Sequence, residues 1–121
     1  MTKQAMHTLI KVIEEFRKLD AEMPMQTAAV FLNVVLNPGV TMKDLADRCG
    51  ISQASTSRNI AALSKWHRLG KAGHDLVEAV EDPAERRRKI VNLTAKGKRV
   101  AASIEAAMNT DGNGNGSSKA A

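Results

Sequence analysis

The sequence is poor in cysteine and aromatic residues, and each shortage limits how the protein can be stabilised. A single cysteine among 121 residues excludes an intramolecular disulfide and is typical of a reducing compartment. With one Trp, two Phe and no Tyr, the core has to be built from aliphatic side chains, which favours helices. No apolar run approaches the roughly 18 residues of a membrane span, and the N-terminus lacks the apolar stretch of a signal peptide. We therefore expect a soluble, cytoplasmic protein, with one domain at residues 1–108 and a flexible, low-complexity tail at 109–121.

Acidic residues are missing from two windows of the chain. The net charge is +5, yet residues 1–47 hold five basic and six acidic groups, whereas residues 48–121 hold thirteen and seven. The windows Arg48 to His74 and Arg86 to Arg99 contain five and seven Lys or Arg residues and no acid. Basic runs are usually only solvated surface, but neutralising phosphates is the largest sequence-independent contribution to DNA affinity. The charge distribution therefore favours a nucleic-acid partner.

Patterns that indicate catalysis or metal binding are also missing. We find no nucleophile with an adjacent base, no carboxylate pair in an apolar setting and no cofactor loop, so we expect neither an enzyme nor a cofactor. His67, His74 and Asp75 lie close together in sequence, but without a cysteine or a second carboxylate nearby we predict no metal site. Cys49 follows Leu45 by one helical turn, which favours a buried structural thiol over a redox sensor.

Residues 41–65, TMKDLADRCGISQASTSRNIAALSK, predict two short helices joined by a tight turn. Thr41 followed by Asp44 is a capping-box-like start for the first helix. Gly50 can take the left-handed conformation that ends this helix, and Ser52 can cap the next one. This layout is that of a helix-turn-helix, whose second helix reads DNA.

The second of these helices has one apolar and one open face. Thr56, Ile60 and Leu63 lie at i, i+4 and i+7 and are expected to face the first helix. The opposite face carries small or hydrogen-bonding side chains, which suits close approach to a major groove, although a capped surface helix without a partner has the same pattern. Base-reading side chains are predicted at Gln53, Ala54, Ser55, Ser57 and Arg58. Contacts to the DNA backbone or minor groove are predicted at Thr41, Ser52, Lys65, Arg86, Arg87 and Arg88.

Residues 3–21 are predicted to form an amphipathic helix. Its apolar stripe is wider than one small partner requires. The stripe is either buried in the domain core or packed against a second copy of the chain, and we favour the second interpretation. The predicted dimer-interface residues are Met6, Leu9, Ile13, Phe16, Val100 and Ile104.

The other elements complete a mostly α chain with a small β-hairpin. Pro24 is predicted as the first residue of a second helix that ends at residues 37–39, and its apolar sequence places it at the centre of the core. Short β-branched strands are predicted at 76–80 and 89–93, joined by a charged loop that contains the three consecutive arginines. A last helix is predicted at 95–108. The order is four helices, two strands and one helix, which is a winged helix-turn-helix.

This order resembles that of the MarR family of winged-helix regulators. The resemblance covers about residues 24–100 and rests on the motifs LADRCGISQASTSRNIAAL (45–63), LVEAVEDPAERRRKIVNLT (76–94) and LTAKGKRV (93–100). It implies a homodimer that binds pseudo-palindromic double-stranded DNA, mostly as a repressor. It also implies a recognition helix at Ser52–Trp66, a wing-tip acid at Glu85 and wing-tip arginines at Arg86 and Arg87.

Two departures from the family pattern affect these expectations. The segment between Trp66 and Leu76 is several residues longer than is usual in the family. The C-terminus has one short helix where the family has two longer ones, so dimerisation depends more on residues 3–21. The effector pocket of the family is then reduced or absent, and nothing in the sequence indicates a small-molecule effector.

The predicted function is that of a dimeric, sequence-specific DNA-binding transcriptional regulator, a repressor. Two alternatives use the same fold. A replication or partition protein of a plasmid or phage would suit the small size, and genomic neighbourhood distinguishes it from a regulator. A protein-interaction module without DNA is the other alternative, and the basic face argues against it.

Overall fold

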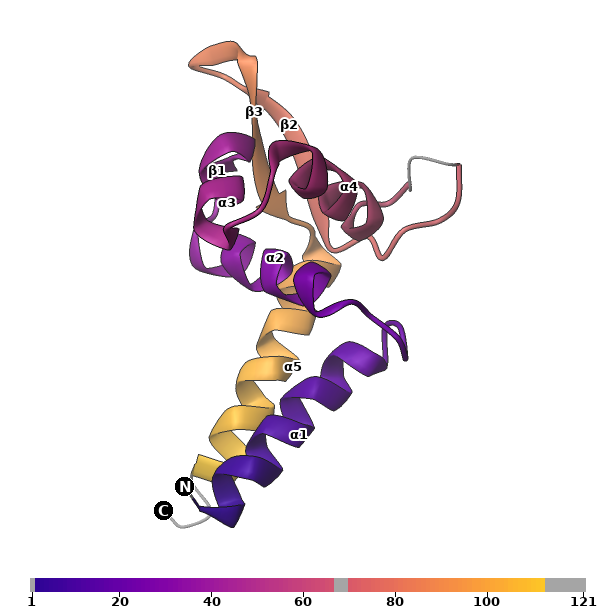
Figure 1. Cartoon of the computed structure of the whole chain (residues 1–121), viewed down its shortest axis with the longest axis vertical. Helices are drawn as coiled ribbons and strands as arrows, with labels where there is room; N and C mark the ends of the chain where they lie inside the picture. The colour runs from indigo at the N-terminus through magenta and orange to yellow at the C-terminus, as the bar shows by residue number, and fades with distance from the viewer. Residues whose placement is uncertain (1, 67–69, 113–121) are drawn as a thin grey trace. The chain divides into compact units, whose positions relative to one another are not determined.

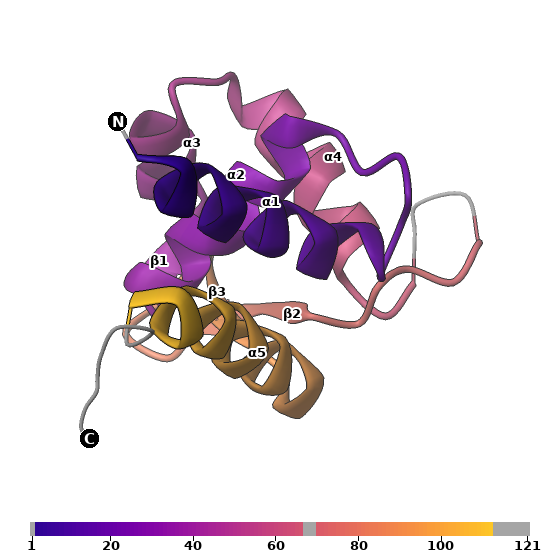
Figure 2. The same cartoon turned by 90° about the horizontal axis from the view of Figure 1, so that it is seen from below.

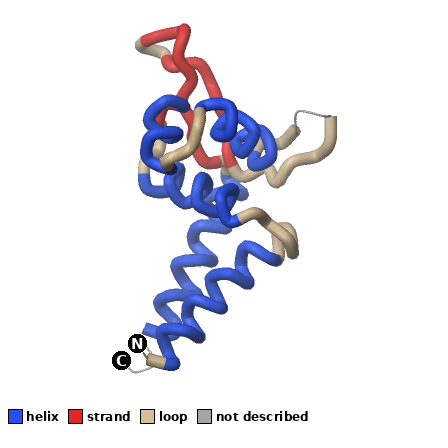
Figure 3. The backbone as a smooth tube through the Cα atoms, in the orientation of Figure 1, coloured by secondary structure: helices blue, strands red, loops and turns tan. Residues whose placement is uncertain are grey.

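The computed structural model describes residues 2–66 and 70–112. Its elements, shown in Figures 1 and 3, are α1 (Lys3–Arg17), α2 (Met25–Leu36), β1 (Val40–Thr41), α3 (Met42–Cys49), α4 (Gln53–Leu63), β2 (Val77–Asp82), β3 (Glu85–Leu93) and α5 (Ala95–Gly112). They fall into two compact units, one formed by Pro24–Lys98 and the other by the described parts of Met1–Met23 and Arg99–Ala121. The single domain at residues 1–108 stays a prediction.

The predicted fold class is confirmed, with one strand more than we expected. The three strands form an antiparallel sheet in the order β1-β3-β2. Val40 of β1 pairs with Val91, and Gly39, with a φ of 80°, donates its N–H to the Val91 carbonyl. A strand of two residues is too short to show an alternating pattern, so only its pairing with β3 identifies it.

Helix α2 is the central helix of Pro24–Lys98, as predicted, and contacts α3, α4 and β3. Val30, Phe31 and Val34 on its inner side are completely buried. Pro24 is the N-cap of this helix rather than its first residue. The outer side of α2 is open, since Met25 and Leu36 are 86% and 77% exposed, which differs from the expectation that nearly the whole helix is buried.

Both terminal helices differ in length from the predictions. Helix α1 ends at Arg17 instead of residue 21, because the chain turns at Asp20, whose side chain accepts the N–H of Glu22. Helix α5 continues to Gly112 and so includes four residues that we assigned to the flexible tail. Adding residues to an existing helix costs little compared with starting one, so weak helix formers can join its end. The rest of the predicted tail, residues 113–121, lies outside the described residues.

Within Met1–Met23 and Arg99–Ala121, the predicted interface residues have different environments. Phe16 and Ile104 are buried, and Val100 is half-buried. Met6, Leu9 and Ile13 on α1 are 40%, 50% and 43% exposed. None of the helices in the described part of the chain is long and apolar enough to cross a membrane.

Candidate nucleic-acid interface

The helix-turn-helix is built by the local hydrogen bonds that the sequence predicts. The hydroxyl oxygen of Thr41 accepts the N–H of Asp44 at 3.1 Å and caps α3. Gly50 ends α3 in the left-handed region, at a φ of 69°. The Ser52 hydroxyl then accepts the N–H of Ser55 at 3.0 Å and caps α4. Each capping hydroxyl keeps its own proton for donation, so both can still contact a phosphate.

Helix α4 has the two faces that its sequence predicts. Thr56, Ile60 and Leu63 are buried against the rest of Pro24–Lys98. Helices α2 and α3 both contact α4 from this side. The predicted base-reading side chains lie on the other side, where Gln53, Ala54, Ser57 and Arg58 are exposed and Ser55 is half-buried. The reading face is therefore accessible over the first two turns of α4.

Arg58 is the exposed cation in the middle of this reading face. Its Nη2 donates to the Ser55 hydroxyl oxygen at 3.0 Å, which holds the guanidinium close to the helix surface. Lys65, predicted to contact the DNA backbone, is exposed beyond the end of α4. The structure thus groups Arg58 with the small residues of the first two turns and separates Lys65 from them.

Asn59 is a residue of α4 that the sequence analysis missed. It is 9% exposed, its carbonyl oxygen accepts from the Thr27 hydroxyl, and its amide donates to the Gln26 side chain and to the Ser55 carbonyl. The helical period could have identified it, because position 59 follows the buried Thr56 by three residues. A polar side chain on the buried side of a helix is expected to have a hydrogen-bond partner, because buried polar groups are rarely left unpaired.

The recognition helix ends earlier than the resemblance implied, at Leu63 instead of Trp66. Four carbonyls at its C-terminal end, which lack partners within a helix, accept N–H groups from the chain as it returns toward β2. His74 donates to the Ala62 carbonyl and Leu76 to the Leu63 carbonyl. The remaining two bonds run from Asp75 to Ser64 and from Gly73 to Lys65. These tertiary bonds end the helix and attach the base of the wing to it.

The two described ends of the extra segment before the wing pair with each other. Trp66, which is 66% exposed, pairs with Ala72 across its base. A Cβ on Gly73 would lie 1.9 Å from the Ser64 carbonyl oxygen, so only glycine fits at this closing point. In Figures 1 and 2, the described residues that precede β2 extend beyond the end of α4. His67, one of the residues considered for metal binding, lies outside the described residues.

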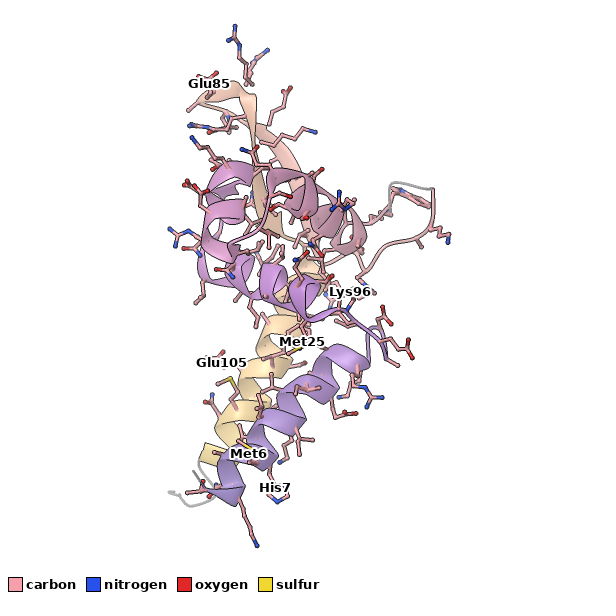
Figure 4. The ribbon with its side chains drawn as sticks, viewed as in Figure 1. Met6, His7, Met25, Glu85, Lys96 and Glu105 are labelled. Carbon is pink, nitrogen blue, oxygen red and sulfur yellow. The ribbon has the colours of Figure 1, made fainter. Side chains whose placement is uncertain are left out.

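The wing consists of β2 and β3, and its arginines lie on a strand rather than in a loop. Regular pairing runs from Val77↔Leu93 to Glu81↔Lys89, after which Asp82 pairs with Glu85. This irregularity leaves residues 86–88 bulged out of the ladder near the tip. The predicted charged loop is too long, because most of its residues belong to β2 and β3. Glu85 lies at the outer end of the wing (Figure 4).

The three wing arginines are not equivalent. Arg88 donates to Asp82 through Nε at 3.0 Å and Nη2 at 2.7 Å, which ties the two strands together next to the turn. The Ala84 N–H and the Arg88 guanidinium both lower the pKa of Asp82 by hydrogen bonding to its charged form. The side chains of Arg86 and Arg87 are exposed, and neither has a hydrogen bond or ion pair within the described part of the chain. Arg86 and Arg87 are therefore available to an anionic partner.

Neither a reactive thiol nor a metal site is indicated among the described residues. Cys49 is partly exposed rather than fully buried, and burial of its thiol raises the thiol pKa. A raised pKa keeps the thiol protonated near neutral pH and disfavours a reactive thiolate. Among the described residues, no three His, Cys, Asp or Glu side chains are placed to hold a metal ion.

Part of this architecture matches the model of a known family. Residues 22–66 match the model of the MarR family. The fold of the chain is a winged helix like that of the solved MarR structure, to which it is 19% identical with a TM-score of 0.62. No curated protein matches the chain.

Several solved structures share this winged-helix fold. The PcaV transcriptional regulator from Streptomyces coelicolor, in complex with its natural ligand, is 24% identical with a TM-score of 0.56, over 76% of this chain and 60% of that one. The MepR–DNA complex of S. aureus is 15% identical with a TM-score of 0.71, over 88% and 79% of the two chains. RV1404 from Mycobacterium tuberculosis is 16% identical with a TM-score of 0.69, over 86% and 66%. In this alignment with the PcaV complex, the chain spans less than two thirds of the length of the matched chain.

Proposed function

We propose that this chain is a dimeric transcriptional regulator that binds double-stranded DNA sequence-specifically and acts as a repressor. The observation that carries the proposal is the exposed face of α4, which is lined by small and hydrogen-bonding side chains around Arg58. This face belongs to the same compact unit as the exposed Arg86 and Arg87 of the wing. The fold shared with MepR, whose structure was solved as a DNA complex, supports the same interpretation.

Helix α4 is the element that reads bases in this proposal. A major groove is about 12 Å wide and admits one helix, and the small residues Ala54 and Ser57 let the helix backbone approach the base edges. Arg58 presents a guanidinium that can donate two hydrogen bonds to a single guanine. The hydroxyls of Thr41 and Ser52 lie at the starts of α3 and α4, where they can donate to phosphates.

The wing contacts the DNA backbone or the minor groove in this proposal. Guanidinium groups are weakly hydrated and are attracted by the negative potential of a narrow minor groove. Arg86 and Arg87 supply two such groups near the tip. Arg88 was also predicted to contact the DNA backbone or minor groove. Because it forms an ion pair with Asp82, we assign it instead to shaping the wing tip.

The dimer is proposed to form through α1. Exposed apolar side chains at Met6, Leu9, Ile10 and Ile13 are costly in water, and burying them against a second copy removes that cost. Met108 on α5, in the same compact unit, is also 51% exposed. Phe16 and Ile104 are already buried in a single chain, so they support this interface rather than form it. A two-fold dimer would match a pseudo-palindromic site.

Selection of bound duplexes from a random DNA pool tests the DNA-binding part of the proposal. The expected result is a pseudo-palindromic motif that also occurs upstream of the protein's own gene. A motif found only in repeated sites of a plasmid or phage would favour the replication or partition function instead. If no duplex is enriched over the starting pool, sequence-specific DNA binding is wrong.

Sedimentation at increasing concentration tests the dimer. Ile13→Glu places a charge on the exposed apolar stripe and should shift the protein from dimer to monomer. His7→Glu is the control, since it adds a charge at another exposed position of α1 and should leave the dimer intact (Figure 4). A wild-type monomer at high micromolar concentration would refute the dimer.

A further inference from the structure

Two sets of hydrogen bonds, which meet at Ser55 through its carbonyl and its hydroxyl, connect the buried side of α4 to its reading face. The hydroxyl of Thr27 on α2 donates to Asn59 Oδ1 at 2.7 Å. Asn59 Nδ2 donates to Gln26 Oε1 at 2.8 Å and to the Ser55 carbonyl at 2.9 Å. The Ser55 hydroxyl oxygen in turn accepts from Arg58 Nη2 at 3.0 Å. Four side chains and one carbonyl thus connect the start of α2 to the exposed guanidinium.

Two parts of α4 are anchored by different kinds of contact. In its last turn, Ile60 and Leu63 are buried, and such apolar contacts are not directional. In its first two turns, residues 53–59, the buried residues are Thr56 and Asn59, both polar. The Thr56 hydroxyl donates to the Ser52 carbonyl within the same segment, so among the described residues only Asn59 joins these two turns to α2 by side-chain hydrogen bonds. The rotation of these two turns therefore depends on directional contacts made by one residue.

We propose that Asn59, held by Thr27, is a positioning residue that determines the sequence preference of α4. It sets the rotation of the first two turns and, through Ser55, the direction of the Arg58 guanidinium. This inference rests on the proposed function, because it concerns which bases Arg58 can reach. A base-reading side chain has to be held within about 0.5 Å of its productive position, which apolar packing alone does not ensure. Buried polar contacts of this kind stabilise one arrangement over its near alternatives.

The combined substitution Thr27→Val with Asn59→Leu tests the proposal. Replacing both partners by apolar groups of similar shape leaves no polar atom unpaired between them, so the protein should remain folded. Affinity for the selected duplex should fall by about tenfold, in the range expected for losing one good base contact. Affinity for a scrambled duplex should stay within about twofold, because the number of phosphate-neutralising cations is unchanged. The readout is the ratio of the two affinities, measured at one salt concentration.

Asn33→Ala is the matched control. Asn33 also donates its side-chain amide to the carbonyl four residues earlier, Ala29, but it lies on α2 and reaches no residue of α4. Its substitution should leave the affinity ratio unchanged. If the combined variant does not fold, the single variants Thr27→Val and Thr27→Ser are compared instead, because only serine retains the hydroxyl that bonds Asn59. Valine should lower the ratio and serine should not.

A double-mutant cycle separates positioning from a general structural role. In an Arg58→Ala background, the combined substitution should have little further effect on the affinity ratio, because the side chain that it positions is gone. Additive losses would overturn the proposal, as would a folded combined variant with the wild-type ratio. A wild-type protein with no preference among duplexes would refute the proposed function itself, and is therefore a distinct outcome.

Discussion

Helix α4 and the wing carry the two candidate DNA contacts, and they are supported in opposite ways. The back of α4 is buried, with Thr56 and Leu63 completely inaccessible, so the rest of its unit fixes where its outer face points. The outer part of the wing is exposed on both strands, and beyond Val80 no residue of β2 or β3 up to Lys89 is buried. Its tip is held by strand pairing and by the Asp82–Arg88 ion pair.

This difference indicates a division of tasks. Reading a base edge requires a donor with a fixed position, which a helix supported from behind can provide. Attraction to phosphates or to minor-groove potential depends mainly on charge and tolerates movement. Substitutions in α4 should therefore alter sequence preference, whereas substitutions in the wing should alter affinity for all duplexes.

The largest effect is expected from removing the support behind α4. Leu63→Ala should lower the free energy of unfolding by about 2 to 5 kcal/mol, because it leaves a cavity at a completely buried position. Val80→Ala in the wing should cost less than about 1 kcal/mol, since Val80 is 39% exposed. Urea unfolding measures both. Equal costs would mean that the wing is supported as firmly as α4.

The second effect concerns base reading. Arg58→Ala should weaken binding to the preferred duplex by about 1 to 3 kcal/mol and relax preference at one base position in each half-site. Arg48→Ala, which removes an equal charge from α3, is the control and should leave preference unchanged. Affinities for single-base variants of the site measure the difference. If Arg58→Ala weakens preferred and scrambled duplexes equally, α4 is not the reading element.

A smaller and more uniform effect is expected from the wing. Arg86→Ala or Arg87→Ala should weaken binding to all duplexes and lower the slope of log affinity against log salt by about one unit for each lost phosphate contact. Arg88→Ala should change the slope less, because Asp82 already neutralises that guanidinium. Titrations at several salt concentrations test this ranking. Loss of sequence preference in the Arg86 variant would reverse the assignment of the two elements.

The smallest effect is a response of the wing tip to acid. The N–H of Ala84 and the side chain of Arg88 lower the pKa of Asp82 below its ordinary value of about 3.9. Because the pKa is lower in the folded state, the contribution of Asp82 to stability is present above the ordinary value and is lost as pH falls through the lower one. The Ala84 amide signal in an NMR titration should therefore change with a midpoint below that of a model aspartate. A midpoint at or above the model value would contradict the pairing.

Local structure was the part of this protein that could be predicted from sequence. Thr41, Gly50 and Ser52 were assigned as caps and turn, and each acts within three or four residues of its own position. Backbone preferences and side-chain caps operate at this range, so a single sequence shows them directly. The buried stripe of α4 was predictable for the same reason, since the helical period alone identifies it.

Contacts between distant residues could not be predicted in this way. Strand β1 exists because Val40 pairs with Val91, and α4 ends at Leu63 because residues 73–76 donate backbone hydrogen bonds to the carbonyls of residues 62–65. The side chains that Asn59 bonds, Thr27 and Gln26, lie more than thirty residues away on α2.

The sequence by itself determined the helix-turn-helix, the positions of its caps and the basic character of its second half. Only the tertiary structure decided which polar side chains are partners, namely Asn59 with Thr27, and where the recognition helix stops. It also decided which wing arginines remain available, since the bulge next to the turn brings Arg88 onto Asp82 and leaves Arg86 exposed. The physical reason is that a hydrogen bond depends on distance and direction in space, whereas a sequence specifies only separation along the chain.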